Sequence, residues 1–477
     1  MKKYSAVFGT IVLVMVFAVA FVACSTDTPL PARDYFIVTF NNNEGDTDAV
    51  PTTVKVWPAD PYVKSHMPVP PAKADNIFDG WLDEEDHDFD ADTRVTRDMT
   101  VYAQWIPGAV AVSKNGGRGE GFDDVGTDAL IKALDYVNTD FVASSGSNTY
   151  TVRIGSAKLI RTLENPYTFS GTGLEVILEG PNAGVTITRS GIFTPFSVDN
   201  DAELTFRAGI TLDGESKNGS GVFVELGKFI MEGGTICGFN NSGVYVNNAA
   251  GTFKMTAGTI RDNNAANGAG IYNTGVFTME GVDCEISENI ASGNGGGVYN
   301  AGTFTMIAGT IRGNEAQDGA GVYNQLNFTM EGQDCEISEN IASGDGGAVY
   351  VTIAGTFSMT AGSIGGNEAD NGGGVCNWGK FYMDGGVILS NTALTDGGGV
   401  ATNPSPAIFN KIKGVIYGSD AGDDSNTAIN GEGHAVFVYV TPGVKRDSTV
   451  PDGEALSLLT IGDEDNNWEP VDDGGEE

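Results

Sequence analysis

The stretch GTFKMTAGTIRDNNAANGAGIYNTG, residues 251–275, contains one unit of the repeat that decides the fold. Its opening phrase, Phe-x-Met, recurs with spacings of 24, 24, 27, 24, 29 and 24 residues. The copies are Phe229-Met231, Phe253-Met255, Phe277-Met279, Phe304-Met306, Phe328-Met330, Phe357-Met359 and Phe381-Met383. A period in this range is typical of stacked units that cannot bury their apolar faces alone. The sequence therefore predicts an elongated array.

Each repeat unit divides into three short apolar segments separated by glycine and asparagine turns. Phe253 and Met255 lie two residues apart and so share one side of a strand, while Ile260 and Ile271 supply two further walls. Stacking such units aligns equivalent side chains in ladders. With the more divergent units upstream, this period predicts an all-β protein built on a right-handed parallel β-helix of roughly ten rungs, spanning residues 109–440.

A helical pattern precedes the stacked strands. Apolar residues recur at helical spacing after Thr127 and Asp128, at Leu130, Ile131, Leu134 and Val137. A helix in this place covers the open end of a β-helix, where unpaired strand edges otherwise aggregate. We expect an N-terminal capping helix near residues 127–139.

The N-terminus has the layout of a secretory signal, with Lys2 and Lys3 before an apolar run at residues 6–22. The run ends in Phe21-Val22-Ala23-Cys24-Ser25, which resembles the lipobox of bacterial lipoproteins, with Phe21 in place of the usual Leu. The resemblance implies a signal peptide over residues 1–24 and a lipid on Cys24. It also implies a secreted, surface-exposed chain that its acyl groups anchor to the cell membrane or the outer membrane. A plain signal peptide or an anchor helix is the alternative, and residues 25–34 form a tether.

Residues 35–106 contain a second set of motifs, Val-Thr-Phe-Asn from Val38, Phe-Asp-Gly-Trp from Phe78 and Thr-Val-Tyr-Ala-Gln-Trp from Thr100. This order resembles the Listeria-Bacteroides repeat, also called the internalin B-type repeat. The resemblance implies a small β-rich module of secreted bacterial surface proteins, without catalytic chemistry. Its aromatic residues supply the apolar area that so small a domain needs, and an aromatic ligand site is the alternative use for them.

The turns of the repeat carry two further phrases, Ile-x-x-Asn, as at Ile260-Asn263, and Gly-Gly-Gly-Val-Tyr at residues 295–299. They resemble the repeats of polymorphic outer-membrane adhesins, with Ile in place of Phe, and more loosely the pectin-lyase-like β-helices of bacterial surface proteins. The resemblance implies an adhesive or display role. The recurring asparagines predict a ladder of turn-stabilising bonds, and ligand binding is the alternative.

Composition excludes some classes of partner. With 26 Lys and Arg against 63 Asp and Glu, the net charge is −37, which excludes nucleic acid as a partner. No cysteine or histidine spacing indicates a metal, and no cofactor is predicted. Cys284 and Cys335 fill the same repeat position two rungs apart, on the order of 10 Å, which is beyond disulfide reach. We expect these cysteines, with Cys237 and Cys376, to be free and buried.

A polysaccharide-active lyase or hydrolase of the pectin-lyase-like class is the alternative function. Hydrolysis of a glycosidic bond needs two carboxylates at a fixed separation. Suitable fragments lie far apart in the sequence, at Asn138-Thr139-Asp140, Gly422-Asp423-Asp424, Gly433-His434-Ala435 and Lys445-Arg446. The outward positions beside Phe-x-Met are mostly threonine, as at Thr303 and Thr305. The sequence therefore predicts no catalytic residue.

A tyrosine recurs at one position of the repeat, at Tyr245, Tyr272, Tyr299, Tyr323 and Tyr350. Strand alternation places each tyrosine opposite its neighbouring Val or Ile, so one of the two rows faces outward. An outward row is a candidate binding surface for a glycan or a protein, and a structural stack is the alternative.

The acidic composition of residues 441–477 predicts a C-terminal tail without a packed core. Together these features predict a non-enzymatic, lipid-anchored surface protein that presents its β-helix to a host, matrix or cell-envelope ligand.

Overall fold

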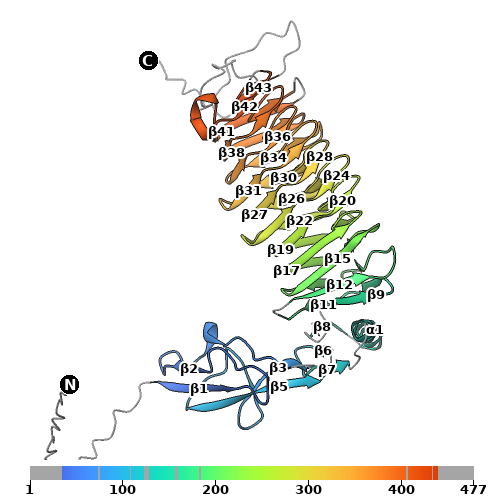
Figure 1. The fold of residues 1–477 in the computed structure, drawn as a ribbon, viewed down its shortest axis with the longest axis vertical. Helices are drawn as coiled ribbons and strands as arrows, with labels where there is room; N and C mark the ends of the chain where they lie inside the picture. Colours follow the sequence, from blue (N-terminus) through green and yellow to red (C-terminus); the bar gives the residue numbers. More distant parts are fainter. Residues whose placement is uncertain are drawn as a thin grey trace, which may run out of the picture.

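The computed structural model describes residues 35–73, 76–107, 109–122, 128–144, 146–155, 160–181, 184–403, 407–431 and 433–438. In these residues a small sheet is followed by a long column of stacked strands (Figure 1). The signal peptide with Cys24, the tether and the acidic tail at 441–477 lie outside the described residues. No helix in the described part of the chain is long and apolar enough to span a membrane.

The N-terminal sheet has the strand order β2-β1-β5-β3-β4, in which β1 and β5 are parallel. Its elements are β1 (Phe36–Asn41), β2 (Thr53–Val56), the 3-10 helix η1 (Lys64–His66), β3 (Asn76–Leu82), β4 (Asp88–Phe89) and β5 (Met99–Pro107). Phe40 lies at the centre of its core, with ring centroids 4.9 Å from Trp81 and 6.0 Å from Phe89. Trp81 and Phe89 are buried, while Phe78 and Trp105 are half-buried. The buried aromatics therefore hold this small domain together.

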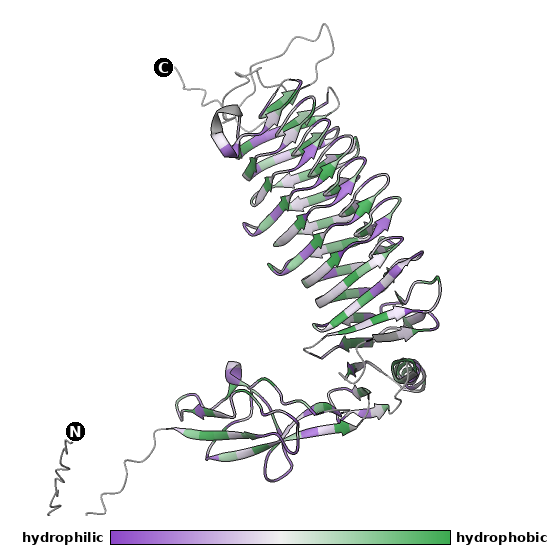
Figure 2. Ribbon diagram, in the orientation of Figure 1, coloured by the Kyte–Doolittle hydropathy of each residue, from purple (hydrophilic) through white to green (hydrophobic). Residues whose placement is uncertain are grey.

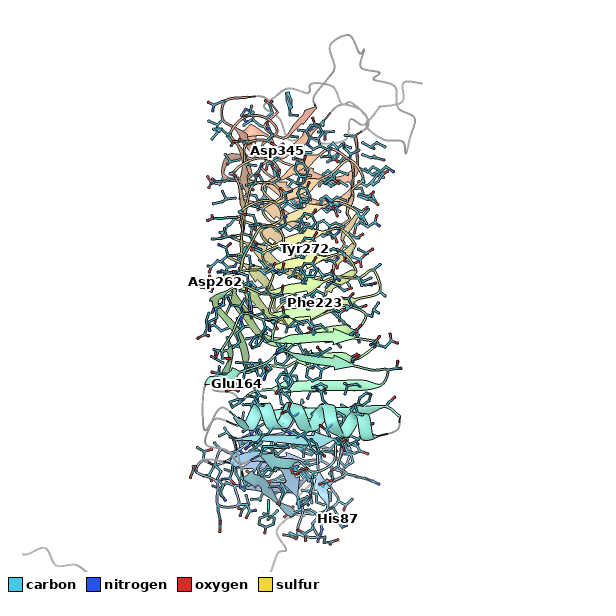
Figure 3. The ribbon with its side chains drawn as sticks, turned by 90° about the vertical axis from the view of Figure 1, so that its right-hand side faces the viewer. His87, Glu164, Phe223, Asp262, Tyr272 and Asp345 are labelled. Carbon is cyan, nitrogen blue, oxygen red and sulfur yellow. The ribbon has the colours of Figure 1, made fainter. Side chains whose placement is uncertain are left out.

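The predicted capping helix is present and longer than expected, because α1 extends over Asp128–Ala143. It packs among β6 (Val110–Lys114), β7 (Glu120–Phe122), β8 (Asn148–Ile154) and β9 (Ile160–Leu163). Leu130, Leu134 and Val137 are fully buried in the same core as the column. The Asp140 carboxylate accepts hydrogen bonds from Lys114 Nζ and the Tyr150 hydroxyl, each at 2.6 Å. Figure 3 shows the helix lying across the end of the column, as a cap requires.

The column is a parallel β-helix, as predicted from the repeat, and it makes about ten turns. We call its first face the Phe-Met wall. Its strands are β11 (Leu174–Glu179), β14 (Glu203–Phe206), β17 (Lys228–Phe239), β19 (Thr252–Arg261), β22 (Val276–Met279), β26 (Thr303–Met306), β30 (Asn327–Met330), β34 (Thr356–Met359), β38 (Lys380–Leu389) and β41 (Ile408–Ile416). The longest of these continue around a bend into the second face, the Ile wall. Its other strands are β12 (Val185–Arg189), β15 (Ile210–Lys217), β23 (Cys284–Ser287), β27 (Gly309–Arg312), β31 (Cys335–Ser338) and β35 (Ser363–Gly365).

The third face, the Tyr wall, is an 11-stranded sheet. Its strands are β10 (Tyr167–Ser170), β13 (Phe196–Asp199), β16 (Val222–Val224), β18 (Val244–Val246), β21 (Ile271–Asn273), β25 (Val298–Asn300), β29 (Val322–Asn324), β33 (Val349–Val351), β37 (Val375–Asn377), β40 (Val400–Thr402) and β43 (Val436–Val438). Two-residue strands form a 7-stranded sheet at the corner between the Ile and Tyr walls. They are β20 (Asn264–Ala265), β24 (Ile290–Ala291), β28 (Glu315–Ala316), β32 (Ile341–Ala342), β36 (Glu368–Ala369), β39 (Thr392–Ala393) and β42 (Thr427–Ala428), and the 3-10 helix η2 (Ser419–Asp424) precedes the last one.

Ladders of identical side chains fill the column, as the repeat predicts. Phe253 pairs in register with Phe277, and Met255 with Met279. All four side chains are fully buried, as are Ile260 and Ile271 on the other walls. The Phe277 and Phe304 rings stack with centroids 4.5 Å apart, close to the spacing between strands. Figure 2 shows the result as green segments recurring along the strands of successive turns.

The recurring asparagines form the expected turn-stabilising ladder. Each buried side chain donates from Nδ2 to Oδ1 of the next, as Asn289 does to Asn314 at 3.0 Å. The ladder comprises Asn263, Asn289, Asn314, Asn340, Asn367, Asn391 and Asn426. A second ladder, which was not predicted from the sequence, links Asn273, Asn300 and Asn324 at 2.8 Å. Because these amides are buried and bonded to one another, they hold the turns in place and do not contact a ligand.

Candidate functional site

The five tyrosines singled out from the sequence occupy the middle position of strands β18, β21, β25, β29 and β33. The residues on either side are fully buried, as Val298 and Asn300 are around Tyr299. Each tyrosine therefore points outward and is half-buried. The structure brings all five together in one row on the outside of the Tyr wall.

The rings in this row stack face to face. Adjacent tyrosine centroids are 4.7 to 5.2 Å apart, and their planes differ by 3 to 14°. Phe223 extends the row, with its centroid 5.5 Å from Tyr245. Phe223 is not among the residues predicted from the sequence, although Val222-Phe223-Val224 has the same pattern as Val244-Tyr245-Val246. We call these six residues the aromatic stripe, and Figure 3 shows Phe223 and Tyr272 one above the other on the column.

Stacking decides which parts of the rings a ligand can reach. Rings about 5 Å apart leave no space for another molecule between them, so the faces of the interior tyrosines are covered. A ligand meets their edges and hydroxyl groups instead. Only the ends of the stripe adjoin smaller side chains, because Phe223 pairs in register with Ser197 and Tyr350 with Cys376.

Burial also keeps the hydroxyl groups of four tyrosines in the stripe protonated. It raises the pKa of the Tyr245, Tyr323 and Tyr350 hydroxyls, and it raises the pKa of Tyr299 to about 12. These phenols are therefore neutral at physiological pH and keep the proton that a hydrogen-bond donor needs. These four hydroxyl groups lie along the axis of the column.

Carboxylate and amide groups lie beside the C-terminal end of the stripe. The backbone N–H of Asp345 donates to Asp318 Oδ1 at 2.9 Å, and Asn371 Nδ2 donates to Asp345 Oδ1 at 2.8 Å. Burial raises the pKa of Asp345, and the charges of Asp318 and Asp345 help to raise the pKa of Tyr350. These half-buried oxygens can accept hydrogen bonds from a ligand that also accepts from the phenols.

The outward side of the Phe-Met wall is occupied by ion pairs and threonines. Lys254 pairs with Glu280 at 2.6 Å, and Arg207 pairs with Glu179 at 3.1 Å and with Glu232 at 3.2 Å. The described residues contain no group of three or more His, Cys, Asp or Glu side chains placed to hold a metal ion. These charges of the wall are therefore already paired with one another.

The sequence fragments considered for polysaccharide cleavage do not meet in space. Asp140 lies on α1 at the start of the column, where it binds Lys114 and Tyr150. Asp423 lies in η2 near the other end, and the His434 ring accepts a hydrogen bond from the Ala428 N–H. Lys445 and Arg446 lie outside the described residues. The two carboxylates are separated by about ten rungs and do not form one site.

The four cysteines of the column, Cys237, Cys284, Cys335 and Cys376, are free and buried, as expected from their positions. Burial raises the pKa of the Cys237, Cys284 and Cys335 thiols to about 11. It raises the pKa of Cys376 as well, with help from the neighbouring Asp345 charge. Since the thiolate is the reactive form, these groups behave as small apolar side chains.

The N-terminal sheet carries the Phe-Asp-Gly-Trp motif on β3 and the Tyr-Ala-Gln-Trp motif on β5. Residues 36–104 match the Listeria-Bacteroides repeat domain. The match to the Listeria-Bacteroides repeat domain thus covers the N-terminal sheet and ends at residue 104, within β5. It includes no part of the column. Searches against the curated proteins and against the solved structures give no match. The likeness of the column to pectin-lyase-like proteins and adhesins stays a prediction.

Proposed function

We propose that this protein is a non-enzymatic, lipid-anchored component of a bacterial cell surface that presents the aromatic stripe to a host, matrix or cell-envelope ligand. The Listeria-Bacteroides repeat domain and the β-helix both fit a structural or adhesive role. The observation that carries the proposal is the unbroken row of six half-buried rings along the Tyr wall. Tyrosine is enriched in binding surfaces because it combines apolar area with a hydrogen-bonding group.

The form of the stripe indicates an extended ligand. Six rings at about 4.8 Å per rung make a flat strip of about 25 Å, which is longer than a compact small molecule needs. An extended glycan or peptide lying along the axis meets one aromatic ring at every rung, and a phenol at every rung except that of Phe223. Affinity for such a ligand then comes from many weak bonds in register rather than from one deep pocket.

The order of the segments along the chain is suited to presenting the column away from the membrane. A lipid on Cys24 holds the N-terminus at the membrane, and the tether and the repeat domain separate it from the column. The stripe then begins at Phe223, beyond the first turns of the β-helix. Labelling cells with radioactive palmitate tests the anchor, since the label is expected on the wild-type protein and not on a Cys24→Ala variant.

Binding to the stripe is testable with a variant that keeps the stack and removes its hydroxyls. We expect Tyr272→Phe, Tyr299→Phe and Tyr323→Phe together to weaken binding tenfold or more, since each lost hydrogen bond contributes about 1 kcal/mol. The measurement is a screen of the full-length protein on glycan and matrix-protein arrays, followed by titration of each hit. Tyr382→Phe is the matched control, because Tyr382 is half-buried on the Phe-Met wall.

Unchanged binding by the triple variant would reject the stripe as the binding surface. Failure of every glycan and matrix protein to bind would reject the adhesive role. Release of new chain ends from acidic polysaccharides by the purified protein would instead establish the enzymatic alternative.

A further inference from the structure

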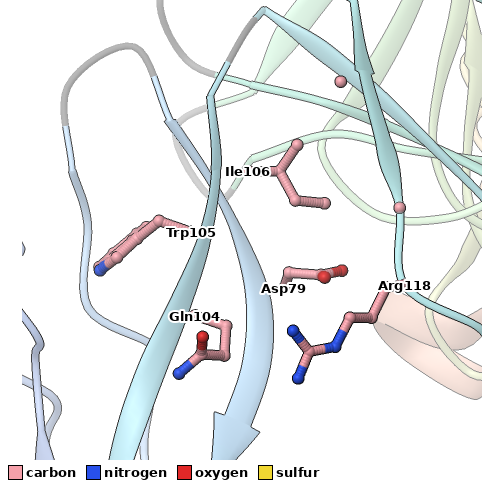
Figure 4. Close-up of a pocket in the computed structure, with 7 residues that line it drawn as sticks. Asp79, Gln104, Trp105, Ile106 and Arg118 are labelled. Carbon is pink, nitrogen blue, oxygen red and sulfur yellow. The ribbon is translucent and has the colours of Figure 1, made fainter.

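The sheet of the Listeria-Bacteroides repeat domain meets the column at one end. Its strand β5 ends at Pro107, just before β6, and Asp79 on β3 pairs with Arg153 on β8 at 2.8 Å. Figure 4 shows Asp79, Ile106 and Arg118 around the pocket at this junction. The opposite end of the sheet points away from the column (Figure 1).

The start of β1 and the end of β2 form this opposite end. β1 runs parallel to β5, with Val38 beside Met99 at the start of β5. β2 runs back antiparallel to β1, with Val56 beside Phe36. The chain also enters the domain here, because β1 is its first strand (Figure 1). We call this part of the domain the outer end.

Four side chains share one face of the outer end. Ile37 lies opposite Lys55 in the register of β1 and β2, so Tyr35 and Trp57 form the next pair on the same face. Val56 points to the other face and is buried in the domain core. Trp57 is 52% exposed, Lys55 is exposed, and Tyr35 and Ile37 are half-buried. We call Tyr35, Ile37, Lys55 and Trp57 the outer patch.

The outer patch combines aromatic area with a positive charge. The ring centroids of Tyr35 and Trp57 are 6.1 Å apart, and Lys55 Nζ lies 4.6 Å from the centre of the Tyr35 ring. Tryptophan and tyrosine are enriched where the hydrocarbon of a membrane meets water, and lysine reaches from apolar surfaces to lipid phosphates. Asp60, whose backbone bridges to Trp57, is paired with Lys64 at 2.8 Å. The outer patch therefore has the composition of a contact with a membrane surface.

The position of the outer patch in the chain brings it close to a membrane. In the proposed function a lipid on Cys24 anchors the chain, and residues 25–34 separate Cys24 from Tyr35. A segment of this length spans at most about 40 Å when fully extended. The outer end is thus held within reach of the bilayer, while the column lies beyond the other end of the sheet (Figure 1).

We propose that the outer patch lies in the headgroup region of the membrane that holds the lipid on Cys24. Trp57 then lies at the edge of the hydrocarbon, and Lys55 lies at the lipid phosphates. This inference rests on the proposed lipid anchor. The acyl chains supply the affinity, and the outer patch sets the orientation, because a lipid holds the chain at one point and a second contact restricts its rotation. The column then stands at a defined angle to the membrane.

Quenching of tryptophan fluorescence by lipids tests this contact. The full-length lipidated protein is reconstituted in vesicles of phosphatidylcholine and phosphatidylglycerol, with or without bromine on the acyl chains near the headgroup. Bromine quenches by contact, so it reports rings that lie in the membrane. We expect brominated vesicles to quench the wild type, and Trp57→Phe to lose about half of that quenching or more. Trp378→Phe is the matched control and should keep the quenching, because Trp378 is an exposed tryptophan of the column.

Polarised infrared spectroscopy of the protein on a supported bilayer of the same lipids tests the orientation. The strands of the column absorb with a dichroism that depends on their angle to the membrane. We expect Trp57→Ser to shift the dichroism towards the value for random orientation, because the second contact is lost. Thr53→Ser is the control and should resemble the wild type, since Thr53 is an exposed residue on the same face of β2.

Equal quenching of the wild type and Trp57→Phe would overturn the proposal, and so would equal dichroism of the wild type and Trp57→Ser. Palmitate labelling and flotation with the vesicles separate this failure from a failure of the anchor. A protein that carries the label and floats, but whose Trp57 is not quenched, keeps its anchor and turns the outer patch towards water or another protein. A protein without the label that does not float lacks the anchor, and the proposed membrane contact falls with it.

Discussion

At the scale of a single residue, Asn314 shows why the repeat needs asparagine at the turn after the Ile wall. Its Nδ2 group donates to Asn340 Oδ1 at 2.9 Å and to the carbonyls of Ile286 and Arg312. Its Oδ1 accepts from the backbone and side-chain N–H groups of Asn289, each at 3.0 Å. A short amide supplies donors and an acceptor at once, which neither aspartate nor alanine does.

Substituting Asn314 should destabilise the column strongly. Asn314→Ala leaves several buried partners without a bond, at about 1–3 kcal/mol each, so we expect a loss of roughly 3–5 kcal/mol in the free energy of unfolding. Urea denaturation followed by circular dichroism measures it. Asn264→Ala is the control, because Asn264 follows the ladder residue Asn263 and is exposed. A loss below about 1 kcal/mol for Asn314→Ala would show that the ladder bonds contribute little.

The tyrosines of the stripe make stability depend on alkaline pH. Burial raises the pKa of Tyr299 from 10.0 to about 12, so between these values the unfolded chain has lost a proton that the folded chain keeps. Stability is therefore complete below pH 10 and falls as the pH rises from 10 towards 12. We expect Tyr299→Phe to be less sensitive than the wild type to alkali over this range. Denaturation midpoints at a series of alkaline pH values measure the effect, and equal slopes for the two proteins would contradict it.

At the scale of the element, sequence alternation predicts which side chains of a strand point inward. The Val-Tyr-Asn and Val-Tyr-Val strands place valine in the core and tyrosine outside, as parity requires. In-register pairing then brings identical tyrosines within stacking distance, because the strand spacing is about 4.8 Å. The alternation of side chains along a strand does not by itself predict that neighbouring rings stack and cover each other's faces. The rings form the structural stack that the sequence left open, and the side that faces solvent offers ring edges and hydroxyls.

The contact between the repeat domain and the column could not be predicted from the sequence, for a physical reason. Asp79 on β3 and Arg153 on β8 belong to different domains that no repeat or motif relates, and they meet only when the two domains pack. The Listeria-Bacteroides repeat motifs did indicate Trp105 as a core or ligand residue, and in the structure it packs against the domain core and donates to the Asn42 and Asn43 carbonyls. The sequence repeat thus predicts the structure of the column well. It does not predict the contact between the column and a domain that lacks the repeat.

At the scale of the whole molecule, a chain of ion pairs connects the repeat domain to the column. Arg153 lies between Asp79 of the repeat domain at 2.8 Å and Glu179 of the first Phe-Met strand at 3.6 Å. Arg207 continues the chain from Glu179 to Glu232 on β17. A small apolar cluster of Ile77, Ile106 and Ala111 lies at the same junction. These contacts make the domain and the column one continuous body at this point.

Removing the first link should free the repeat domain from the column. Arg153→Ala leaves Asp79 buried without its partner, and we expect it to weaken docking by about 1–3 kcal/mol, the usual cost of losing a hydrogen bond to a charged group. The radius of gyration from X-ray scattering should increase, and protease should cut near residue 108 more readily. Arg312→Ala is the matched control, since it breaks the Arg312–Glu285 pair at 2.7 Å within the column. An unchanged scattering profile and cleavage rate in Arg153→Ala would mean that the apolar cluster alone holds the domains together.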